Sequence, residues 1–338
     1  MKMMLKYPVL IAIALLSFMP ACRKDRLSRR DKKILYTEPT QSEIDDILKD
    51  WNSRNLTPTE IVVIEEHAIL NDKFTLKIVS YRVQGIKEYA ALLIPDVDSL
   101  VPVRMYVGGF GLDQTVNSIA MVLDSSQGAS PGIFAFPALR GQSLEITVNG
   151  TSYTSPVSEG VHCDAFDGCT DDVLSLLNVV ALIEEHADVD RTSVRGGSRG
   201  GTVALLAGIR DKRVKKVVDV VGPTDMLELT SQNEHDLTYE CQFLAGLKNE
   251  NATIEATRKK LIASSPYYFA KYLPLTQLHM GLKDVRVPIG QAHKLEQKMN
   301  ELGKSGGFRL FTYDRTHDDI GQDNMEMQTR IEEFLSQP

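Results

Sequence analysis

The chain is poor in cysteine and has no excess of basic residues. Four cysteines in 338 residues do not make a disulfide framework in a chain of this length. Lysine and arginine number 38 against 45 for aspartate and glutamate, so the net charge is -7, which argues against a general nucleic-acid binder. No internal repeat or low-complexity run is present. With 43% hydrophobic and 25% charged residues, the composition is that of a globular protein able to bury a sizeable core.

The apolar stretch at residues 8–19 is well short of the ~20 residues that span a bilayer. Lys2 and Lys6 precede it and the small residue Ala21 follows it, which predicts a secretory signal peptide over residues 1–21 rather than a buried helix. Residues 18–22 resemble a bacterial lipobox, although Met19 and Pro20 depart from the commonest pattern and leave ordinary cleavage open. The resemblance implies lipidation of Cys22, and with it an exported protein of the bacterial envelope, anchored to a membrane and facing the periplasm or the exterior.

Residues 22–33 form a basic segment ahead of an acidic body. Residues 23–33 hold seven basic and two acidic residues, whereas residues 34–338 hold 29 basic and 43 acidic ones. We expect residues 22–33 to be a solvated tether, either lying against anionic headgroups or simply disordered. Residues 34–59 are predicted to be a peripheral helical extension, with a helix over 42–52.

The body, residues 60–338, begins with strands and then alternates strands with helices. Alternating apolar and polar residues predict three strands at 60–70, 73–83 and 87–94, which form an antiparallel edge. Further strands are predicted at 101–107, 132–137, 192–196, 214–221, 275–280 and 308–313, and helices at 171–186, 200–209, 289–302 and 329–335. This order predicts an α/β fold with a mostly parallel sheet and helices on both faces. Residues 226–262 lack strand character and are a candidate lid of helices.

A glycine-flanked serine, Gly196-Gly197-Ser198-Arg199-Gly200, lies between a predicted strand and a predicted helix. That is the setting of a G-x-S-x-G nucleophile elbow, in which the serine hydroxyl projects from a sharp, strained turn. Side chains two residues before and two after the serine would collide, so Gly196 and Gly200 suit those positions. The pattern makes Ser198 a candidate nucleophile rather than part of a structural turn, and the helix that follows would stabilise negative charge.

A serine nucleophile needs a histidine base and an acid that orients it. In this architecture the order along the chain is serine, acid, histidine, and four histidines follow Ser198. His317 follows the last predicted strand, so a loop can bring it to the carboxyl edge of the sheet. His235 falls in the candidate lid, His279 within a strand and His293 on a helix. For the acid, Asp284 follows the strand at 275–280 directly; its rivals Asp314, Asp318 and Asp319 lie too close to His317 in sequence.

These motifs together resemble the catalytic domain of the prolyl oligopeptidase family of serine peptidases, which are α/β-hydrolases. The resemblance rests on Gly-Gly-Ser-Arg-Gly-Gly, on Gly281-Leu282-Lys283-Asp284-Val285-Arg286-Val287-Pro288 and on Thr316-His317-Asp318, with gaps of 86 and 33 positions. Ser265-Pro266 and Arg140-Gly141 are similar as well, so the resemblance covers about residues 60–338. It implies Ser198 as nucleophile, Asp284 as orienting acid and His317 as general base and acid, with no metal and no organic cofactor.

The sequence departs from the family in two respects. Many members carry a β-propeller before the hydrolase domain, and too few residues precede Glu60 here to form one. The second departure concerns the oxyanion hole, for which the backbone N–H of Arg199 is one expected donor. The family often supplies a second donor from a Tyr or His before a Gly-Gly-like turn, but Val107 fills that position. Either Tyr106 shifts in, or a backbone N–H near Gly109 or Phe110 serves.

Cys163 and Cys169 lie in one predicted loop, and a disulfide between them is plausible outside the cytoplasm. Two free thiols are the alternative, and the spacing around His162 matches no common zinc pattern. Cys241 is expected to be buried and unpaired.

The sequence therefore predicts a serine hydrolase acting through an acyl-enzyme, most readily a peptidase of the prolyl oligopeptidase type without a propeller. A carboxylesterase acting on acyl esters or acylated glycans is the alternative. A third hypothesis, from a different functional class, is a catalytically inactive binding protein tethered to the membrane. The expected partners are a peptide or acyl-ester substrate and a membrane, and no nucleic acid.

Overall fold

The computed structural model describes residues 27–70, 72–110, 116–121, 132–164, 166–249 and 251–337. The predicted signal peptide, Cys22 and the start of the tether lie outside these residues. Within the described ranges, none of the helices has both the length and the apolar character needed to cross a membrane.

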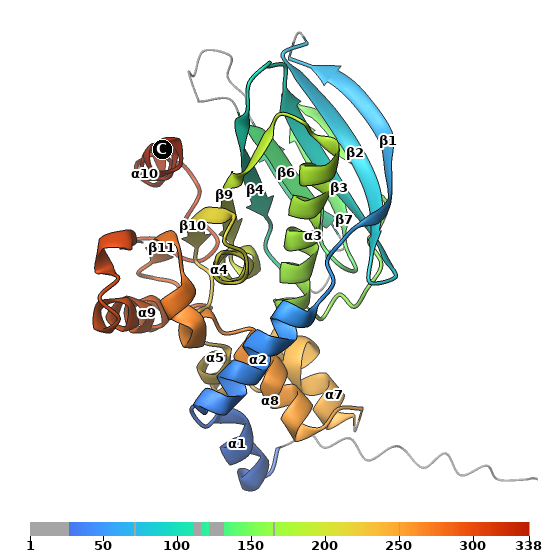
Figure 1. Ribbon diagram of the computed structural model, residues 1–338. Helices are drawn as coiled ribbons and strands as arrows, with labels where there is room; N and C mark the ends of the chain where they lie inside the picture. Colours follow the sequence, from blue (N-terminus) through green and yellow to red (C-terminus); the bar gives the residue numbers. More distant parts are fainter. Residues whose placement is uncertain are drawn as a thin grey trace, which may run out of the picture.

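Nine strands form one mixed sheet in the order β1-β2-β3-β6-β4-β9-β10-β11-β12 (Figure 1). The first four strands in this order pair antiparallel, and the strands from β6 to β12 pair parallel. The strands are β1 (Thr59–Ile69), β2 (Phe74–Val83), β3 (Ile86–Pro95), β4 (Val101–Val107), β6 (Ile133–Ala138), β9 (Ala187–Gly197), β10 (Val214–Val220), β11 (Leu275–Gly281) and β12 (Phe308–Tyr313). The predicted parallel sheet with an antiparallel N-terminal edge is confirmed, and the strand predicted at 192–196 is the second half of β9.

A second, three-stranded sheet was not predicted from the sequence. It consists of β5 (Val116–Met121), β7 (Ser143–Val148) and β8 (Thr151–Thr154). Three alternate side chains of β7, Leu144, Ile146 and Val148, are buried in a common apolar cluster with side chains of β2, β3 and β6. This small sheet therefore covers part of one face of the main sheet, which we expected helices to cover.

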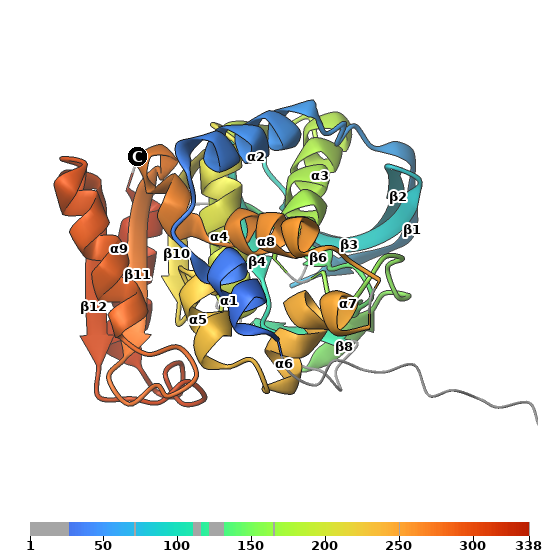
Figure 2. The same cartoon turned by 90° about the horizontal axis from the view of Figure 1, so that it is seen from below.

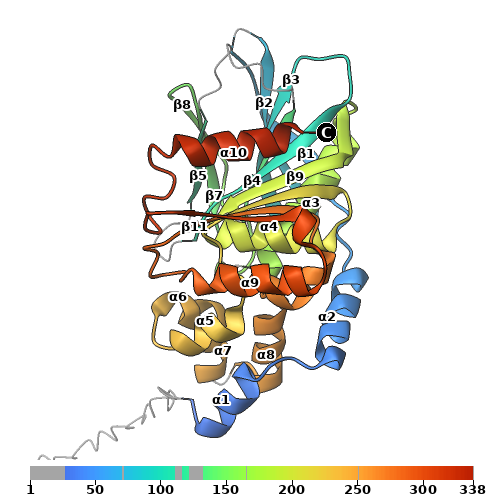
Figure 3. The same cartoon turned by 90° about the vertical axis from the view of Figure 1, so that its left-hand side faces the viewer.

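Helices cover both faces of the main sheet. On one face lie α3 (Asp167–Ile183), α4 (Arg199–Arg210) and α9 (Gly290–Glu301), whose apolar side chains share the largest core cluster with the central strands. On the other face α10 (Met325–Ser336) packs Met327, Ile331 and Leu335 against β10. Figure 3 shows α10 and α9 on opposite sides of the sheet. The helix predicted at 171–186 is present as α3, which starts and ends a few residues earlier than predicted.

Further helices form a layer outside α3, α4 and α9. The layer contains α1 (Arg29–Tyr36), α2 (Gln41–Ser53), α5 (Met226–Gln232), α6 (Leu237–Tyr239), the π-helix η1 (Glu240–Leu244), α7 (Ala245–Lys248) and α8 (Ile254–Ala263). Two 3-10 helices, η2 (Pro266–Tyr272) and η3 (Ser305–Gly307), precede β11 and β12 respectively. Leu35 and Trp51 from the N-terminal helices share an apolar core with Leu261 of α8 and Leu206 of α4. The predicted extension and the candidate lid therefore pack together as one layer (Figure 2).

Arg258 of α8 joins the N-terminal helices to this layer. Its guanidinium donates to the carbonyls of Ile34, Leu35 and Thr37 at 2.8, 3.0 and 2.8 Å. It also pairs with Glu43 at 2.5 Å, and this hydrogen bond lowers the pKa of the Glu43 carboxyl to about 2.

The part of the expected tether within the described residues differs from the prediction. Residues 29–33 open α1 rather than forming a solvated linker, because Ser28 and Asp31 make a capping box there. Leu27 is buried, and Lys32 pairs with Glu234 of the outer helical layer. The helix predicted at 42–52 is present as α2, begun by a second capping box at Thr40 and Glu43.

Candidate active site

Ser198 occupies a sharp turn between β9 and α4. Its φ is 52° and its ψ is -121°, a conformation that side-chain-bearing residues rarely adopt and that stores strain. A Cβ on Gly196 would lie 2.0 Å from the Gly200 carbonyl oxygen, and a Cβ on Gly200 would lie 2.1 Å from the Val107 carbonyl oxygen. Both positions therefore require glycine. The contact between positions 196 and 200 was anticipated from the sequence, whereas the contact of Gly200 with β4 was not. The Ser198 N–H donates to the Val220 carbonyl at 2.8 Å, which fixes the turn against β10.

The structure brings Ser198, Asp284 and His317 into one hydrogen-bonded series. His317 Nε2 lies 2.9 Å from Ser198 Oγ, and His317 Nδ1 lies 2.7 Å from Asp284 Oδ2. The three residues follow β9, β11 and β12, whose carboxyl ends meet at one edge of the parallel sheet. The Asp284 side chain is fully buried and that of His317 is 10% exposed, so solvent reaches part of the imidazole while the carboxylate is shielded from water.

Backbone contacts hold the loops that carry Asp284 and His317. Asp284 Oδ1 accepts the N–H groups of Arg286 and Val287, each at 2.9 Å, which leaves Oδ2 for the imidazole. The Lys283 N–H donates to the Arg315 carbonyl at 2.9 Å, which joins the two loops. A Cβ on Gly281 would lie 2.5 Å from that same carbonyl oxygen, so glycine allows the loops to approach.

The other acids and histidines considered from the sequence lie elsewhere. Asp314 pairs with Lys283, Asp318 pairs with Arg286, and Asp319 accepts two hydrogen bonds from Thr316. None of these three carboxylates has a hydrogen bond to the imidazole of His317 within the described residues.

His279 is buried in β11 between Tyr313 and Gln277. Its burial, aided by the charges of Arg195 and Arg330, lowers its pKa to about 3. His235 and His293 are exposed on the outer helical layer and on α9. None of these histidines is placed to act as the base for Ser198.

The candidate oxyanion donors do not all lie beside Ser198. Arg199 is the first residue of α4, where backbone N–H groups have no acceptor within the helix. Gly109 faces Ser198 directly, since a Cβ on Gly109 would be 3.8 Å from the Ser198 Cβ. Phe110 follows it in the same turn.

Tyr106 does not shift into the site, and that expectation is corrected. From Arg104 to Val107 the register of β4 with β9 is continuous, so successive side chains there alternate between the faces of the sheet. The Tyr106 ring stacks against Phe136 at 5.6 Å and lies 6.0 Å from Phe134, on the face covered by the small sheet and α10. The guanidinium of Arg195 lies over the ring at 5.9 Å. Of the two alternatives left open by the sequence, the geometry leaves a backbone N–H at Gly109 or Phe110.

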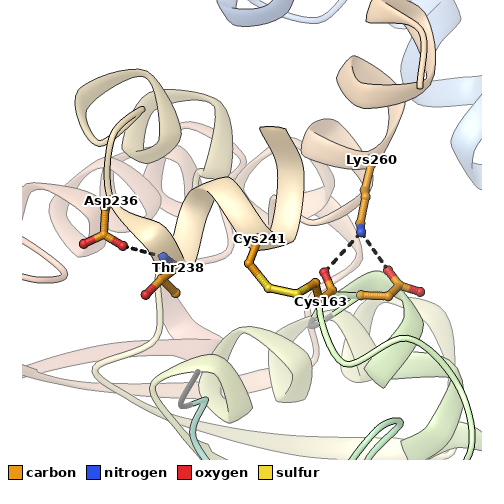
Figure 4. The surroundings of a disulfide bond; sticks show 6 residues. Cys163, Asp236, Thr238, Cys241 and Lys260 are labelled. Atoms are coloured by element: carbon orange, nitrogen blue, oxygen red, sulfur yellow. Dashed lines mark hydrogen bonds and ion pairs between the residues drawn. A yellow bond between two sulfur atoms is a disulfide. The ribbon is translucent and has the colours of Figure 1, made fainter. Parts of the chain in front are cut away.

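The structure contradicts both alternatives for Cys163 and Cys169, a shared disulfide and two free thiols, and the expectation that Cys241 is buried and unpaired is wrong. Cys163 is bonded to Cys241 of η1, and Cys169 is a free thiol (Figure 4). Cys169 lies in the first turn of α3 and is fully buried in the main core cluster. Burial raises the pKa of the Cys169 thiol to about 12.

This disulfide joins the outer helical layer to the neighbourhood of Ser198. Cys163 follows His162, whose ring lies 4.9 Å from the ring of Phe110. Tyr239, two residues before Cys241, has its pKa raised by burial and then by the carboxylates of Asp236 and Asp284. The segment formed by α6 and η1 therefore lies near Phe110 through the disulfide and near Asp284 through Tyr239. Sequence reasoning found neither this link nor Tyr239, since no local pattern pairs positions 163 and 241.

Comparisons with known proteins agree with the fold. The sequence profile of the prolyl oligopeptidase family matches residues 159–337, more than half of the chain. No curated protein sequence matches this chain.

Two solved structures illustrate the structural likeness. Acetyl xylan esterase 1 from Thermoanaerobacterium sp. JW/SL YS485 has a TM-score of 0.63 and 15% identity, covering 93% of this chain and 100% of that one. Pyrococcus horikoshii acylaminoacyl peptidase has a TM-score of 0.58 and 16% identity, covering 78% of this chain. This chain spans about two fifths of that peptidase, 41% of its length. At such identities the likeness establishes a common α/β-hydrolase fold.

Proposed function

Because the chain belongs to the prolyl oligopeptidase family and is a serine hydrolase, we propose that it hydrolyses its substrate through an acyl-enzyme formed on Ser198. His317 is the general base and acid, and Asp284 orients it. The observation that supports these roles is the continuous hydrogen-bonded series from Ser198 Oγ through His317 to Asp284 Oδ2. The three residues follow β9, β11 and β12, so they are far apart in sequence and meet only in the folded chain.

The proposed reaction has two stages. The Ser198 hydroxyl attacks the acyl carbon while its proton passes to His317 Nε2, and Asp284 stabilises the imidazolium that forms. His317 then gives that proton to the leaving amine or alcohol as the tetrahedral intermediate collapses to the acyl-enzyme. Water attacks next, loses a proton to His317 and releases the acid, and the proton returns to Ser198. No step needs a metal or an organic cofactor.

The oxyanion of the tetrahedral intermediate is proposed to rest on backbone N–H groups. Arg199 supplies one from the start of α4, where the helix dipole also favours negative charge. Gly109 or Phe110 supplies the second, since Gly109 lies against Ser198.

The substrate class proposed first is a peptide, as the family membership suggests. A carboxylesterase is the second candidate, and a specific observation favours it: the acetyl xylan esterase aligns over its whole length with this chain. The catalytic residues serve either substrate, because both reactions transfer an acyl group to Ser198.

A fluorophosphonate probe tests the proposed nucleophile. We expect covalent labelling of the full-length protein at Ser198 and no labelling of Ser198→Ala. Labelling that is absent from the unmodified protein, or that persists in the variant, would favour a catalytically inactive binding protein. Hydrolysis of aminoacyl amides, short-chain acyl esters and acetylated xylan oligosaccharides then separates the substrate classes; cleavage of esters alone would exclude the peptidase assignment.

We also propose that the protein is exported and lipid-anchored at Cys22, on the sequence pattern of residues 1–22. The Cys163–Cys241 disulfide supports an oxidising compartment, because disulfides persist there and are rare in the cytoplasm. Incorporation of an alkyne-bearing fatty acid into the protein, and its loss in Cys22→Ala, is the expected result. Equal incorporation in both would contradict the assignment.

A further inference from the structure

The side chain of Arg199 is buried directly behind the candidate oxyanion loop, residues 108–110. Only 2% of the residue is exposed. Its Nη2 atom lies 2.6 Å from the Gly109 carbonyl oxygen, 3.3 Å from that of Gly108 and 2.9 Å from Oε1 of Gln142. The guanidinium also lies 5.7 Å from the centre of the Phe110 ring. One side chain therefore contacts every residue of the loop.

The guanidinium has no carboxylate partner within hydrogen-bonding distance among the described residues. Its Nε and Nη1 atoms are buried there without any hydrogen-bond partner. The nearby carboxylate of Asp172 is already bound by Arg140, at 2.7 Å from Nη2 and 3.0 Å from Nε. Burying a charge without a paired opposite charge is costly, and proteins rarely keep such a group for stability alone. The position of this cation beside the nucleophile indicates a functional reason.

The planarity of the peptide group connects Arg199 to the oxyanion hole. In a trans peptide the C=O of one residue and the N–H of the next point in opposite directions. Since the carbonyls of Gly108 and Gly109 point at the guanidinium, the N–H groups of Gly109 and Phe110 point away from it. Neither N–H donates a hydrogen bond to another residue in the described part of the chain. Gly109 lies against Ser198, where an acceptor forms during the reaction.

We propose that Arg199 is a positioning residue that holds residues 108–110 so that their N–H groups face the oxyanion formed at Ser198. This inference rests on the proposed function of Ser198. A turn with two consecutive glycines has many accessible conformations, and the guanidinium selects one of them by binding its carbonyls. Arg199 thus contributes to both halves of the hole, one through its own backbone N–H and the other through its side chain.

The test compares Arg199→Met and Arg199→Lys with the unmodified protein. Loss of one oxyanion donor lowers turnover by about 10²–10³, so we expect kcat of Arg199→Met on a short-chain nitrophenyl ester to fall by about a hundredfold, with KM within about threefold. Arg199→Lys keeps the charge and can reach one carbonyl, so it should recover part of the loss. An alkyl trifluoromethyl ketone, which forms a tetrahedral oxyanion on the serine, should bind Arg199→Met more weakly in proportion to kcat. If Arg199 served folding alone, the decrease in kcat and the decrease in inhibitor affinity would not be proportional.

Arg258→Met is the matched control, because it removes another buried arginine that binds backbone carbonyls. Arg258 lies on α8 in the outer helical layer and binds the N-terminal helices rather than residues 108–110. It should lower the unfolding midpoint while leaving kcat and inhibitor affinity unchanged. If Arg199→Met does not fold, Arg199→Lys and Gln142→Leu decide, and the latter should lower kcat about tenfold. A folded Arg199→Met with kcat within threefold of the unmodified protein overturns the inference. An unmodified protein that neither hydrolyses the ester nor reacts with fluorophosphonate overturns the proposed function instead.

Discussion

The carboxylate of Asp284 divides its two oxygens between the backbone and His317. Oδ2 lies 2.7 Å from His317 Nδ1, while Oδ1 accepts the N–H groups of Arg286 and Val287. The backbone bonds fix the plane of the carboxylate, so Oδ2 has one orientation toward the imidazole. In the proposed mechanism that contact holds the proton on Nδ1, so that Nε2 is free to accept the proton of Ser198.

Asp284→Asn is therefore expected to lower kcat by about 10³–10⁴ with little effect on folding. The amide can donate to Nδ1 and stabilise the tautomer in which Nε2 carries the proton, which cannot act as a base. Turnover of a nitrophenyl ester and the rate of fluorophosphonate labelling both report the loss. Asp318→Asn is the matched control, because Asp318 is exposed and pairs with Arg286 rather than His317. Near-normal turnover in Asp284→Asn would mean that another carboxylate orients the imidazole.

Gly200→Ala is expected to damage both stability and activity. The added Cβ would lie 2.1 Å from the Val107 carbonyl oxygen, so the start of α4 or the end of β4 must move. Overpacking of this kind costs about 1–3 kcal/mol, and the movement displaces Ser198 from His317. Thermal unfolding and ester hydrolysis measure the two effects.

Gly290→Ala provides the comparison for Gly200→Ala. Gly290 opens α9 with nothing within 4 Å of its Cβ position, so alanine there should leave activity unchanged and stability equal or slightly higher. The steric account of the elbow would be refuted by a Gly200→Ala protein that unfolds at the unmodified temperature and remains active.

Breaking the Cys163–Cys241 disulfide is expected to destabilise the fold. The bond closes a loop across a sequence separation of 78, and disulfides typically stabilise proteins by about 2–4 kcal/mol, with longer loops at the upper end. A reductant should lower the unfolding midpoint of the unmodified protein and have no effect on the Cys163→Ser/Cys241→Ser variant.

Cys169→Ala separates the disulfide from the free thiol. Cys169 is fully buried and unpaired, so this variant should keep the full response to reductant. In the folded protein Cys169 should also resist alkylation, because burial raises its pKa to about 12 and leaves little thiolate. Loss of the reductant response in Cys169→Ala would mean that the pairing is different.

The features that sequence reasoning located are those set by local patterns. Ser198, Asp284 and His317 each follow a strand with a clear apolar pattern, and parallel strands bring their carboxyl ends to one edge. Their convergence could therefore be expected from the order of these strands along the chain. The distances between the three side chains could not be predicted from the sequence and come from the structure.

The features that sequence reasoning missed depend on long-range packing. The partner of Cys163 lies in η1, which forms only because the outer helical layer folds over the core. The guanidinium of Arg199 faces a loop 90 residues earlier in the chain, and no spacing rule connects the two. The small sheet was missed because β8 is four residues long and largely exposed, so its alternation carries little information.

The last prediction concerns pH and the buried His279. Its pKa is about 3 in the folded chain, chiefly because burial disfavours the charged form, against an ordinary value of 6.5. Between these values the unfolded chain binds a proton that the folded chain does not. Stability from the neutral imidazole is thus fully present above pH 6.5 and declines as pH falls toward 3, by up to about 1.4 kcal/mol per pH unit.

Replacing His279 with a group that does not titrate should flatten this decline. His279→Gln keeps an amide that can bond Tyr313 and Gln277, so its free energy of unfolding by urea should fall less steeply from pH 6.5 to 4.5 than that of the unmodified protein. His293→Gln is the control, because His293 is exposed on α9 and should leave the slope unchanged. Parallel curves for His279→Gln and the unmodified protein would show that a buried neutral imidazole at position 279 does not govern the acid sensitivity of the fold.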